Sequence, residues 1–342
     1  MGKKKIIAIA IVILLFIGCV GIYYYQKIFS NNVQKSGFVF INSTDDFPKL
    51  TKKLAPYIIN INDFTWVSKL KKFTKIKSGK YSIQENMSTN DLVNMFRGGL
   101  QTTVKLSFNN QDTLEKLAGR IAEQIEVDSI SLLTVFRDRK FLLENNFDEK
   151  SILCIFIPNS YEVYWNVSAE KLRDKMLLEF KTFWNNERVA KAKKQNLTPN
   201  EVITLASIIQ KETAQKSERP IVAGLYLNRL KNDWPLQADP TIIYCIHQLK
   251  GQDYEVKRVL TVDLEINSPY NTYKNLGLPP SLISMPDVSA IESVLNHEKH
   301  DYYYMCASID KIGFHEFAKS LPQHNKNAKK YRDWLNKQGI NK

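Results

Sequence analysis

The sequence predicts an α+β protein: an N-terminal transmembrane helix, then a small module of helices and strands, then a larger mixed α+β domain. The first observation is an apolar stretch without charges at residues 6–25. The second is that alternating, strand-like segments such as residues 104–108 occur beside helical segments with capping signals. The third is the length of 342 residues, which suggests about two domains.

Composition excludes several classes of protein. With 44% hydrophobic residues the chain has enough apolar material for a packed core, and a mean hydropathy of −0.31 excludes a membrane protein of many spans. Four cysteines are too few for a disulfide miniprotein, and they lack metal-ligand spacing, so we expect neither a metal site nor a cofactor. The net charge of +13 suits nucleic acid, an anionic membrane or an anionic polymer.

The N-terminal apolar stretch indicates a membrane anchor. Twenty helical residues span about 30 Å, the thickness of one hydrocarbon core. Lys3, Lys4 and Lys5 precede the stretch, so we expect residues 1–5 in the cytoplasm and the rest of the chain outside it. A cleaved signal peptide would have a shorter apolar region and a small-residue cleavage site. Export argues against nucleic acid and favours an anionic wall polymer as the partner of the remaining charge of +10, with ordinary solubilising charge as the alternative.

The small module is expected within residues 36–130. A capped helix is its clearest element, because Ser88 and Asp91 have capping-box spacing and Gly98–Gly99 ends the pattern. The other expected elements are strands at 38–41, 79–83 and 104–108, a helix at about 46–55 capped by Ser43 or Thr44, and helices at 64–73 and 113–126.

The larger domain is expected over residues 151–342, with a boundary near 150–165. Residues 151–157 resemble a buried strand that breaks at Pro158–Asn159, and residues 169–194 have the period of one long amphipathic helix. Near the end of the chain we expect a hairpin and a final helix.

One helix places a carboxylate among apolar positions. Thr198 and Glu201 have capping-box spacing, with Pro199 at the first helical position. Glu212 follows Leu205 by seven residues, which is about 700° of helical rotation and so only ~20° from the same face. Burial raises the pKa of a carboxyl group, which suits a general acid. The alternative is a structural glutamate paired with a basic residue.

Two later polar segments are candidates for substrate binding. Gln237 and Asp239 precede a proline-initiated helix that Asp239 could instead simply cap. A proline-bounded loop then carries Tyr270, Asn271, Thr272 and Tyr273, whose amides, hydroxyls and rings suit a sugar. The alternative is a loop that bonds to itself. Glu218 is expected as a first-turn charge of a helix capped by Ser217.

Taken together, six blocks in this order resemble the endolytic murein transglycosylase (YceG-like) family: LASIIQKET, SERPIVAGLYLNRL, LQADPTIIY, SPYNTYKNLGLPPSLIS, DYYYMCAS and HNKNAKKY. The resemblance implies that Glu212 is the catalytic acid/base, and that residues 36–100 form a LysM-like subdomain. It suggests as glycan-positioning residues Gln237, Asp239, Tyr270, Asn271, Thr272, Tyr273 and Asn325. The chain departs from the family pattern at Asn159, where an acid is usual, and at Ala318, where Asn is usual.

The resemblance also implies an activity. It predicts cleavage of the MurNAc–GlcNAc β-1,4 bond within nascent peptidoglycan strands, giving 1,6-anhydro-MurNAc ends and ending elongation. The implied partners are peptidoglycan and the synthases that polymerise it, and the implied place is the bacterial cell membrane with the catalytic domain outside. Two alternatives remain: a non-catalytic wall-binding scaffold, and a glycan hydrolase that uses water and a second carboxylate, with Glu218, Asp239 or Asp263 as candidates.

Overall fold

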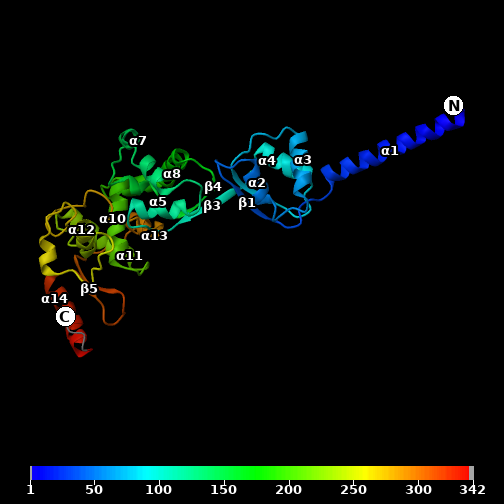
Figure 1. Ribbon diagram of the computed structural model, residues 1–342. Helices are drawn as coiled ribbons and strands as arrows, with labels where there is room; N and C mark the ends of the chain where they lie inside the picture. The colour runs from blue at the N-terminus through cyan, green and yellow to red at the C-terminus, as the bar shows by residue number, and fades with distance from the viewer. Residues whose placement is uncertain (1, 339–342) are drawn as a thin grey trace. The chain divides into compact units, whose positions relative to one another are not determined.

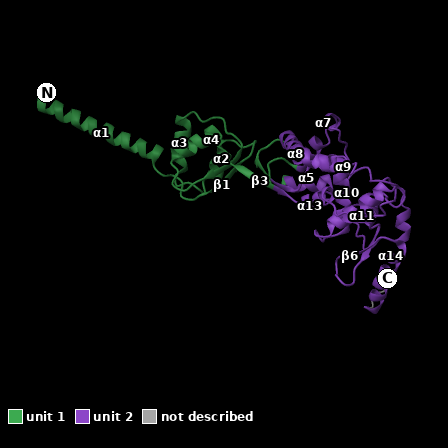
Figure 2. Cartoon of the chain, turned by 180° about the vertical axis from the view of Figure 1, so that it is seen from behind, with its two compact units in different colours: residues 1–106, 122–128, 161–168 green, residues 107–121, 129–160, 169–342 purple. Residues whose placement is uncertain are grey.

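The computed structural model describes residues 2–338 and confirms a mixed α+β protein. The chain divides into two compact units (Figure 2). Unit 1 comprises Met1–Leu106, Ala122–Asp128 and Tyr161–Ser168, and unit 2 comprises Ser107–Ile121, Ser129–Ser160 and Ala169–Lys342. The domain boundary expected near residues 150–165 stays a prediction.

The N-terminal helix α1 spans Lys3–Phe29 and has no buried residue (Figure 1). Within the described part of the chain it is the one helix long and apolar enough to cross a membrane, with a mean hydropathy of 3.0 over 18 residues. It includes the expected span 6–25. It also includes residues 26–29, beyond the expected span.

Unit 1 has a small core closed by an antiparallel strand pair. Strand β1 (Gly37–Ile41) pairs with β2 (Gly79–Ile83), with Ile41 opposite Gly79. Helices α2 (Phe47–Leu54) and α3 (Ile61–Leu70) lie between them in the chain, and α4 (Thr89–Gly98) follows. The fully buried side chains of the core include Ile41, Leu50, Leu54, Phe64, Val67, Tyr81, Ile83, Leu92, Val93 and Phe96.

The caps of unit 1 confirm one expectation and correct two. The capping box of Ser88 and Asp91 is formed, and Gly99 ends α4 with a left-handed φ of 74°. The cap of α2 is Asp46, which accepts from the backbone of Lys49, and not Ser43 or Thr44. Helix α3 begins three residues earlier than expected, because the Asn60 side chain caps it.

Strands β3 (Thr103–Phe108) and β4 (Asn159–Tyr164) form a two-stranded sheet. The expected strand at residues 151–157 is wrong: the structure has a 3₁₀ helix, η1 (Ile152–Ile155), and the strand starts only at Asn159. The Asp148 side chain accepts from the backbone of Lys150 and Ser151, which starts a tight turn before the buried run. A short apolar run fits a buried strand or a buried helical turn equally well, so its hydrophobicity could not decide.

Unit 2 is mainly helical. Its elements are α5 (Leu114–Ala122), α6 (Ser129–Phe136), α7 (Arg139–Glu144), α8 (Ala169–Phe183), α9 (Asn186–Lys194), α10 (Pro199–Glu212), α11 (Arg219–Lys231), α12 (Asp239–Lys250), η2 (Thr261–Glu265), α13 (Val288–Leu295), β5 (Tyr304–Ala307), β6 (His315–Ala318) and α14 (Leu321–Lys337). The single helix expected at 169–194 is two helices. The buried Trp184 ends the first, and the Asn185 side chain caps the second.

Helix α10 is the centre of unit 2. It contacts α9, α11, α12 and α13, and every residue from Val202 to Ile209 is buried (Figure 1). The expected capping box of Thr198 and Glu201 and the first-turn Pro199 are confirmed. Near the C-terminus, β5 and β6 form the expected antiparallel hairpin, with Ala307 opposite His315. A helix buried on all sides gives its last residue, Glu212, a fixed position.

Candidate active site

The site is built around Glu212, the last residue of α10. Its side chain is half-buried, and its Oε1 accepts a hydrogen bond of 2.5 Å from the hydroxyl of Tyr226 on α11. Tyr226 is fully buried, so this donor is held in place by packing. The hydrogen bond from Tyr226 therefore fixes one carboxylate oxygen of Glu212. On the side of α10 the carboxyl group lies next to apolar residues, as the helical phase predicted.

Opposing influences set the charge of Glu212. Burial is the largest and raises its pKa to about 7. The hydrogen bond from Tyr226 and the charges of His315 and Arg229 lower the pKa, while the charge of Asp239 raises it. Near neutral pH both protonation states are populated, so this carboxyl group can give a proton and take one back.

Arg229 joins three parts of the site. Its Nε and Nη2 donate to the carbonyl of Tyr303 at 2.8 and 2.6 Å, and its Nη1 donates to the carbonyl of Leu236 at 2.5 Å. The side chain is buried, and burial lowers the pKa of its guanidinium. Arg229 thus places a cation near Glu212 and fixes both the residues before β5 and the loop before α12.

Two exposed candidates lie at the start of α12: Asp239, its first residue, and Gln237 just before it. Asp239 does not cap α12: the cap position is Ala238, and the carboxylate instead accepts a 2.5 Å hydrogen bond from the hydroxyl of Tyr273. Gln237 is exposed, has a left-handed φ of 49°, and donates its backbone N–H to the carbonyl of Thr272 at 3.0 Å. The charges of Asp239 and Glu212 both raise the pKa of Tyr273, after the larger effect of its burial. Asp239, Tyr273 and Glu212 therefore belong to one electrostatic group.

Comparison with known proteins shows the family of this chain. The model of the YceG-like family matches residues 39–330. The chain belongs to the YceG-like family. The resemblance seen in the sequence is thereby confirmed.

Two relatives carry the name endolytic murein transglycosylase. The one from Streptococcus pneumoniae (strain D39) is 30% identical over 292 residues, which cover 78% of this chain and 52% of that protein. The one from Bacillus subtilis (strain 168) is 28% identical over 334 residues, covering 91% of this chain and 90% of that protein. The chain thus spans about half the length of the Streptococcus relative and most of the Bacillus one.

The crystal structure of a YceG-like protein from Listeria monocytogenes has a similar fold. It superimposes with a TM-score of 0.55 and 28% sequence identity, and the match covers 85% of this chain and 98% of that chain.

Three of the predicted residues in this YceG-like chain are buried and hydrogen-bonded to other parts of the protein. The Tyr270 hydroxyl pairs with Ser281 at 2.6 Å, and the Asn271 side chain donates to the carbonyls of Leu264 and Ile266, both at 2.8 Å. The Thr272 hydroxyl accepts from the backbone of Ala238 at 3.0 Å and pairs with Thr241 at 2.8 Å. The self-bonded alternative thus holds for Tyr270 and Asn271, whereas Thr272 ties the loop to the start of α12.

Asn325 is the last of the predicted residues. It is exposed on α14, and within residues 2–338 its side chain has no hydrogen bond to Glu212 or to the groups around it.

An ion pair beside Glu212 was not predicted from the sequence. Glu218 is buried, with 3% exposure, and does not act as a first-turn charge. Its Oε1 accepts the backbone N–H of His315 at 2.6 Å, and its Oε2 lies 2.9 Å from Nδ1 of the same residue. The two residues are 97 positions apart, and no local pattern connects them.

An aromatic cluster was also not predicted from the sequence. The Trp234 ring lies 5.6 Å from the rings of both Tyr303 and Tyr304, and Tyr304 stacks on His324 at 5.3 Å. The three consecutive tyrosines at residues 302–304 were the available signal.

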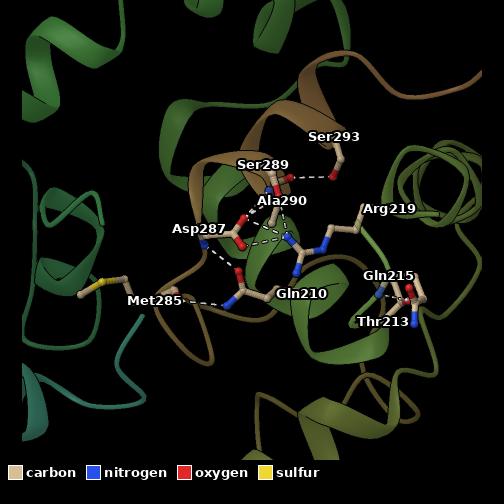
Figure 3. Close-up of polar contacts among 9 residues, drawn as sticks. All are labelled: Gln210, Thr213, Gln215, Arg219, Met285, Asp287, Ser289, Ala290 and Ser293. Atoms are coloured by element: carbon tan, nitrogen blue, oxygen red, sulfur yellow. Dashed lines mark hydrogen bonds and ion pairs between the residues drawn. The ribbon is translucent and has the colours of Figure 1, made fainter. Parts of the chain in front are cut away.

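A second network fixes the backbone on either side of Glu212 (Figure 3). Gln210 accepts the backbone N–H of Asp287 at 2.6 Å and donates to the carbonyl of Met285 at 3.3 Å. Arg219 Nη1 donates to both carboxylate oxygens of Asp287, at 2.8 and 3.0 Å, and to Ser289 at 2.7 Å. The end of α10 and the start of α11 are thus tied to the start of α13, which limits the movement of Glu212.

A cavity of about 1370 Å³ in unit 2 is not at this site. It lies beside the start of α10, near Asn200 and Thr204, and against the loop at residues 277–281. Glu212 does not line it. Within residues 2–338, no group of three His, Cys, Asp or Glu side chains could hold a metal ion.

Proposed function

We propose that this chain is a membrane-anchored endolytic peptidoglycan transglycosylase, with Glu212 as its acid/base. The observation that carries the proposal is the half-buried carboxyl group with a pKa of about 7, in a chain of the YceG-like family. The names of the Streptococcus and Bacillus relatives supply the substrate and the reaction.

The reaction needs one carboxyl group. Protonated Glu212 gives its proton to the glycosidic oxygen between MurNAc and GlcNAc, and the C1–O4 bond breaks through an oxocarbenium-like transition state. The Glu212 carboxylate then takes the proton of the C6 hydroxyl of the same MurNAc, and O6 bonds to C1. No water is consumed, and Glu212 ends protonated. The nucleophile belongs to the substrate, so proximity contributes much of the rate.

The predicted binding residues then fall into two groups. Gln237, Asp239 and Tyr273 are exposed or half-buried near Glu212, so we assign them direct contacts with the glycan. Tyr270, Asn271 and Thr272 act indirectly, by shaping the loop. Asn325 stays a candidate on sequence resemblance alone.

Helix α1 is the proposed anchor. With Lys3, Lys4 and Lys5 at its start, it leaves the N-terminus in the cytoplasm and unit 2 outside. An enzyme tethered in this way reaches strands that are still being polymerised, so synthases are the proposed partners and termination of elongation the proposed outcome. The strand–helix–helix–strand order of residues 37–83 supports a self-contained LysM-like module that binds the wall.

A glycan hydrolase is the second candidate, because the charge of Asp239 acts on Glu212 and could belong to a water-activating base. Glu218 is a poor choice for that base, since both its oxygens are bonded to His315. Asp263 accepts from the backbone of Leu260, in its own turn.

The test uses the full-length chain in detergent micelles with purified peptidoglycan. Products of the wild type, Glu212→Gln and a control with an exposed glutamate changed, Glu149→Gln, are compared by mass spectrometry. Anhydro ends made by the wild type and the control but not by Glu212→Gln support the transglycosylase. Reducing ends support the hydrolase, and absence of cleavage by the wild type leaves the scaffold.

A further inference from the structure

The Glu218–His315 pair is built more rigidly than a surface ion pair. Both carboxylate oxygens of Glu218 are used by one residue, at 2.6 Å to the backbone N–H and 2.9 Å to Nδ1 of His315. Glu218 is 3% exposed, and the buried Thr213 side chain also helps to lower its pKa. Both the backbone and the ring of His315 are therefore fixed relative to the start of α11.

The pair is joined to Glu212 through the chain and through charge. Thr213 directly follows Glu212 and its side chain acts on the pKa of Glu218, so the Glu218–His315 pair lies next to the residue that follows Glu212. Because Glu218 occupies Nδ1, the other ring nitrogen, Nε2, stays available. The charge of His315 lowers the pKa of Glu212, and the charge of Glu212 raises the pKa of His315.

The protonation of His315 follows from its partners. Burial alone lowers the pKa of His315, but the hydrogen bond and charge of Glu218 outweigh it, so the net pKa lies above 6.5. For Glu218 burial raises the pKa, and the bonds from His315 outweigh that effect in turn. Each partner thus favours the charged form of the other, the carboxylate of Glu218 and the imidazolium of His315.

We propose that His315 is a positioning residue of the Glu212 site: Glu218 fixes its imidazolium, whose charge stabilises the Glu212 carboxylate as it forms during proton donation to the glycan. This inference rests on the proposed function for its catalytic meaning, and on the geometry of the pair for its physical basis. It gives a role in the reaction to two residues that neither touch the substrate nor carry its proton.

Arg229 also lowers the pKa of Glu212, and the remaining groups around Glu212 differ from His315 in charge. Tyr226 donates one neutral hydrogen bond, and Asp239, bonded to Tyr273, adds a negative charge. The guanidinium of Arg229 is positive but is directed by three hydrogen bonds at the carbonyls of Tyr303 and Leu236.

His315 itself faces few competing charges. Glu218 and Glu212 act on it, and the ring of Phe317 lies 6.4 Å away. On the packed elements β5 and α14, Cys306 and Lys330 interact with Glu316. Adjacent residues of a strand point to opposite faces, so these two groups belong to the other side of β6.

The test measures anhydro-end formation against pH, with the full-length chain in micelles. Activity falls as pH rises through the pKa of Glu212, because the acid form is lost. In His315→Gln we expect the maximal rate to fall by about tenfold, and this alkaline limb to move up by about half a pH unit or more. Glu218→Gln is expected to act in the same direction, because the neutral amide that replaces the carboxylate no longer favours the imidazolium.

Two variants separate charge from architecture. His315→Lys restores a cation next to Glu218, and its alkaline limb is expected to return toward that of the wild type. His247→Gln, on α12, removes a half-buried histidine whose ring is hydrogen-bonded to the carbonyl of Tyr254, and should leave the profile unchanged. Equal losses in His315→Gln and His315→Lys, with the limb unmoved, would show a purely structural role and overturn the inference.

A titration without substrate separates this inference from the proposed function. In the chain labelled with ¹³C-glutamate, the Glu212 signal is identified by its loss in Glu212→Gln, and its midpoint is followed by NMR. A higher midpoint in His315→Gln supports the inference even if the wild type makes no anhydro ends. An identical midpoint contradicts it even if the enzyme is active.

Discussion

Glu212 and Glu218 are six residues apart, one at the end of α10 and the other just before α11, and their chemistry is opposite. Burial dominates at Glu212 and raises its pKa to about 7. At Glu218 the bonds from His315 outweigh burial and the pKa is lowered. Whether a buried carboxyl group keeps its proton thus depends on its hydrogen-bonded and charged partners as well as on burial.

The largest expected effect is on catalysis at the first of these carboxyl groups. Glu212→Gln keeps the shape but has no proton to give, so we expect turnover to fall by at least about 10³-fold. The rate of anhydro-end formation measures this. Glu218→Gln, which keeps Glu212, should retain far more activity, and equal losses would erase the contrast between the two sites.

The next effect is on stability at Glu212. A carboxyl group whose folded pKa is raised stabilises the fold fully below its unfolded pKa of 4.5, and this contribution is lost as pH rises through about 7. Glu212→Gln cannot titrate, so its unfolding free energy relative to the wild type should rise by about 3 kcal/mol between about pH 4 and pH 8. Urea unfolding followed by tryptophan fluorescence measures it. A difference that does not vary with pH would show an unperturbed carboxyl group.

Glu218 should show the opposite slope. Its lowered pKa means that its contribution is present above the unfolded value of 4.5 and is lost as pH falls through the folded value. We expect Glu218→Gln to lose about 2 kcal/mol near neutral pH and progressively less under acid conditions. The same urea titrations test this, and a loss that persists undiminished in acid would contradict the ion pair.

The smallest effect sharpens the comparison at Glu212. Tyr226→Phe removes the 2.5 Å hydrogen bond, so the carboxylate loses a donor and the pKa of Glu212 should rise further. We expect about a tenfold loss in rate and an alkaline limb at higher pH. Tyr254→Phe, a change of an exposed tyrosine on the same unit, is the control. An alkaline limb that moves to lower pH would mean that the Tyr226 hydroxyl does not favour the ionised form of Glu212.

The contrast between Glu212 and Glu218 also shows which features could be predicted from the sequence alone. Thr198, Glu201 and Leu205 predicted α10 and the inward position of Glu212, because caps and helical phase are local properties. The same local reasoning made Glu218 a first-turn charge. Its real partner, His315, is 97 residues away, and only the docking of the β5–β6 hairpin brings the two together.

Competing local signals explain the other differences. Asp239 before Pro240 is a plausible helix cap, but Tyr273 from a loop 34 residues later takes its carboxylate. The helical period continues through residues 169–194, but the buried Trp184 and the Asn185 cap divide it. In each case a tertiary contact or a second cap outweighed a correct local preference.

Helix α1 does not end where the apolar stretch does. Its last turns pack against α3 of the same unit: the Tyr24 ring stacks on Trp66 at 5.1 Å, and Lys27 lies 3.5 Å from Asp63. The proposed anchor therefore continues into the first folded module without a slack linker. A module joined so closely to a membrane helix explores a thin layer instead of a volume. In the proposed function, the distance from the membrane then sets the effective concentration of the module at the inner surface of the wall. The module does not reach polymer beyond that layer.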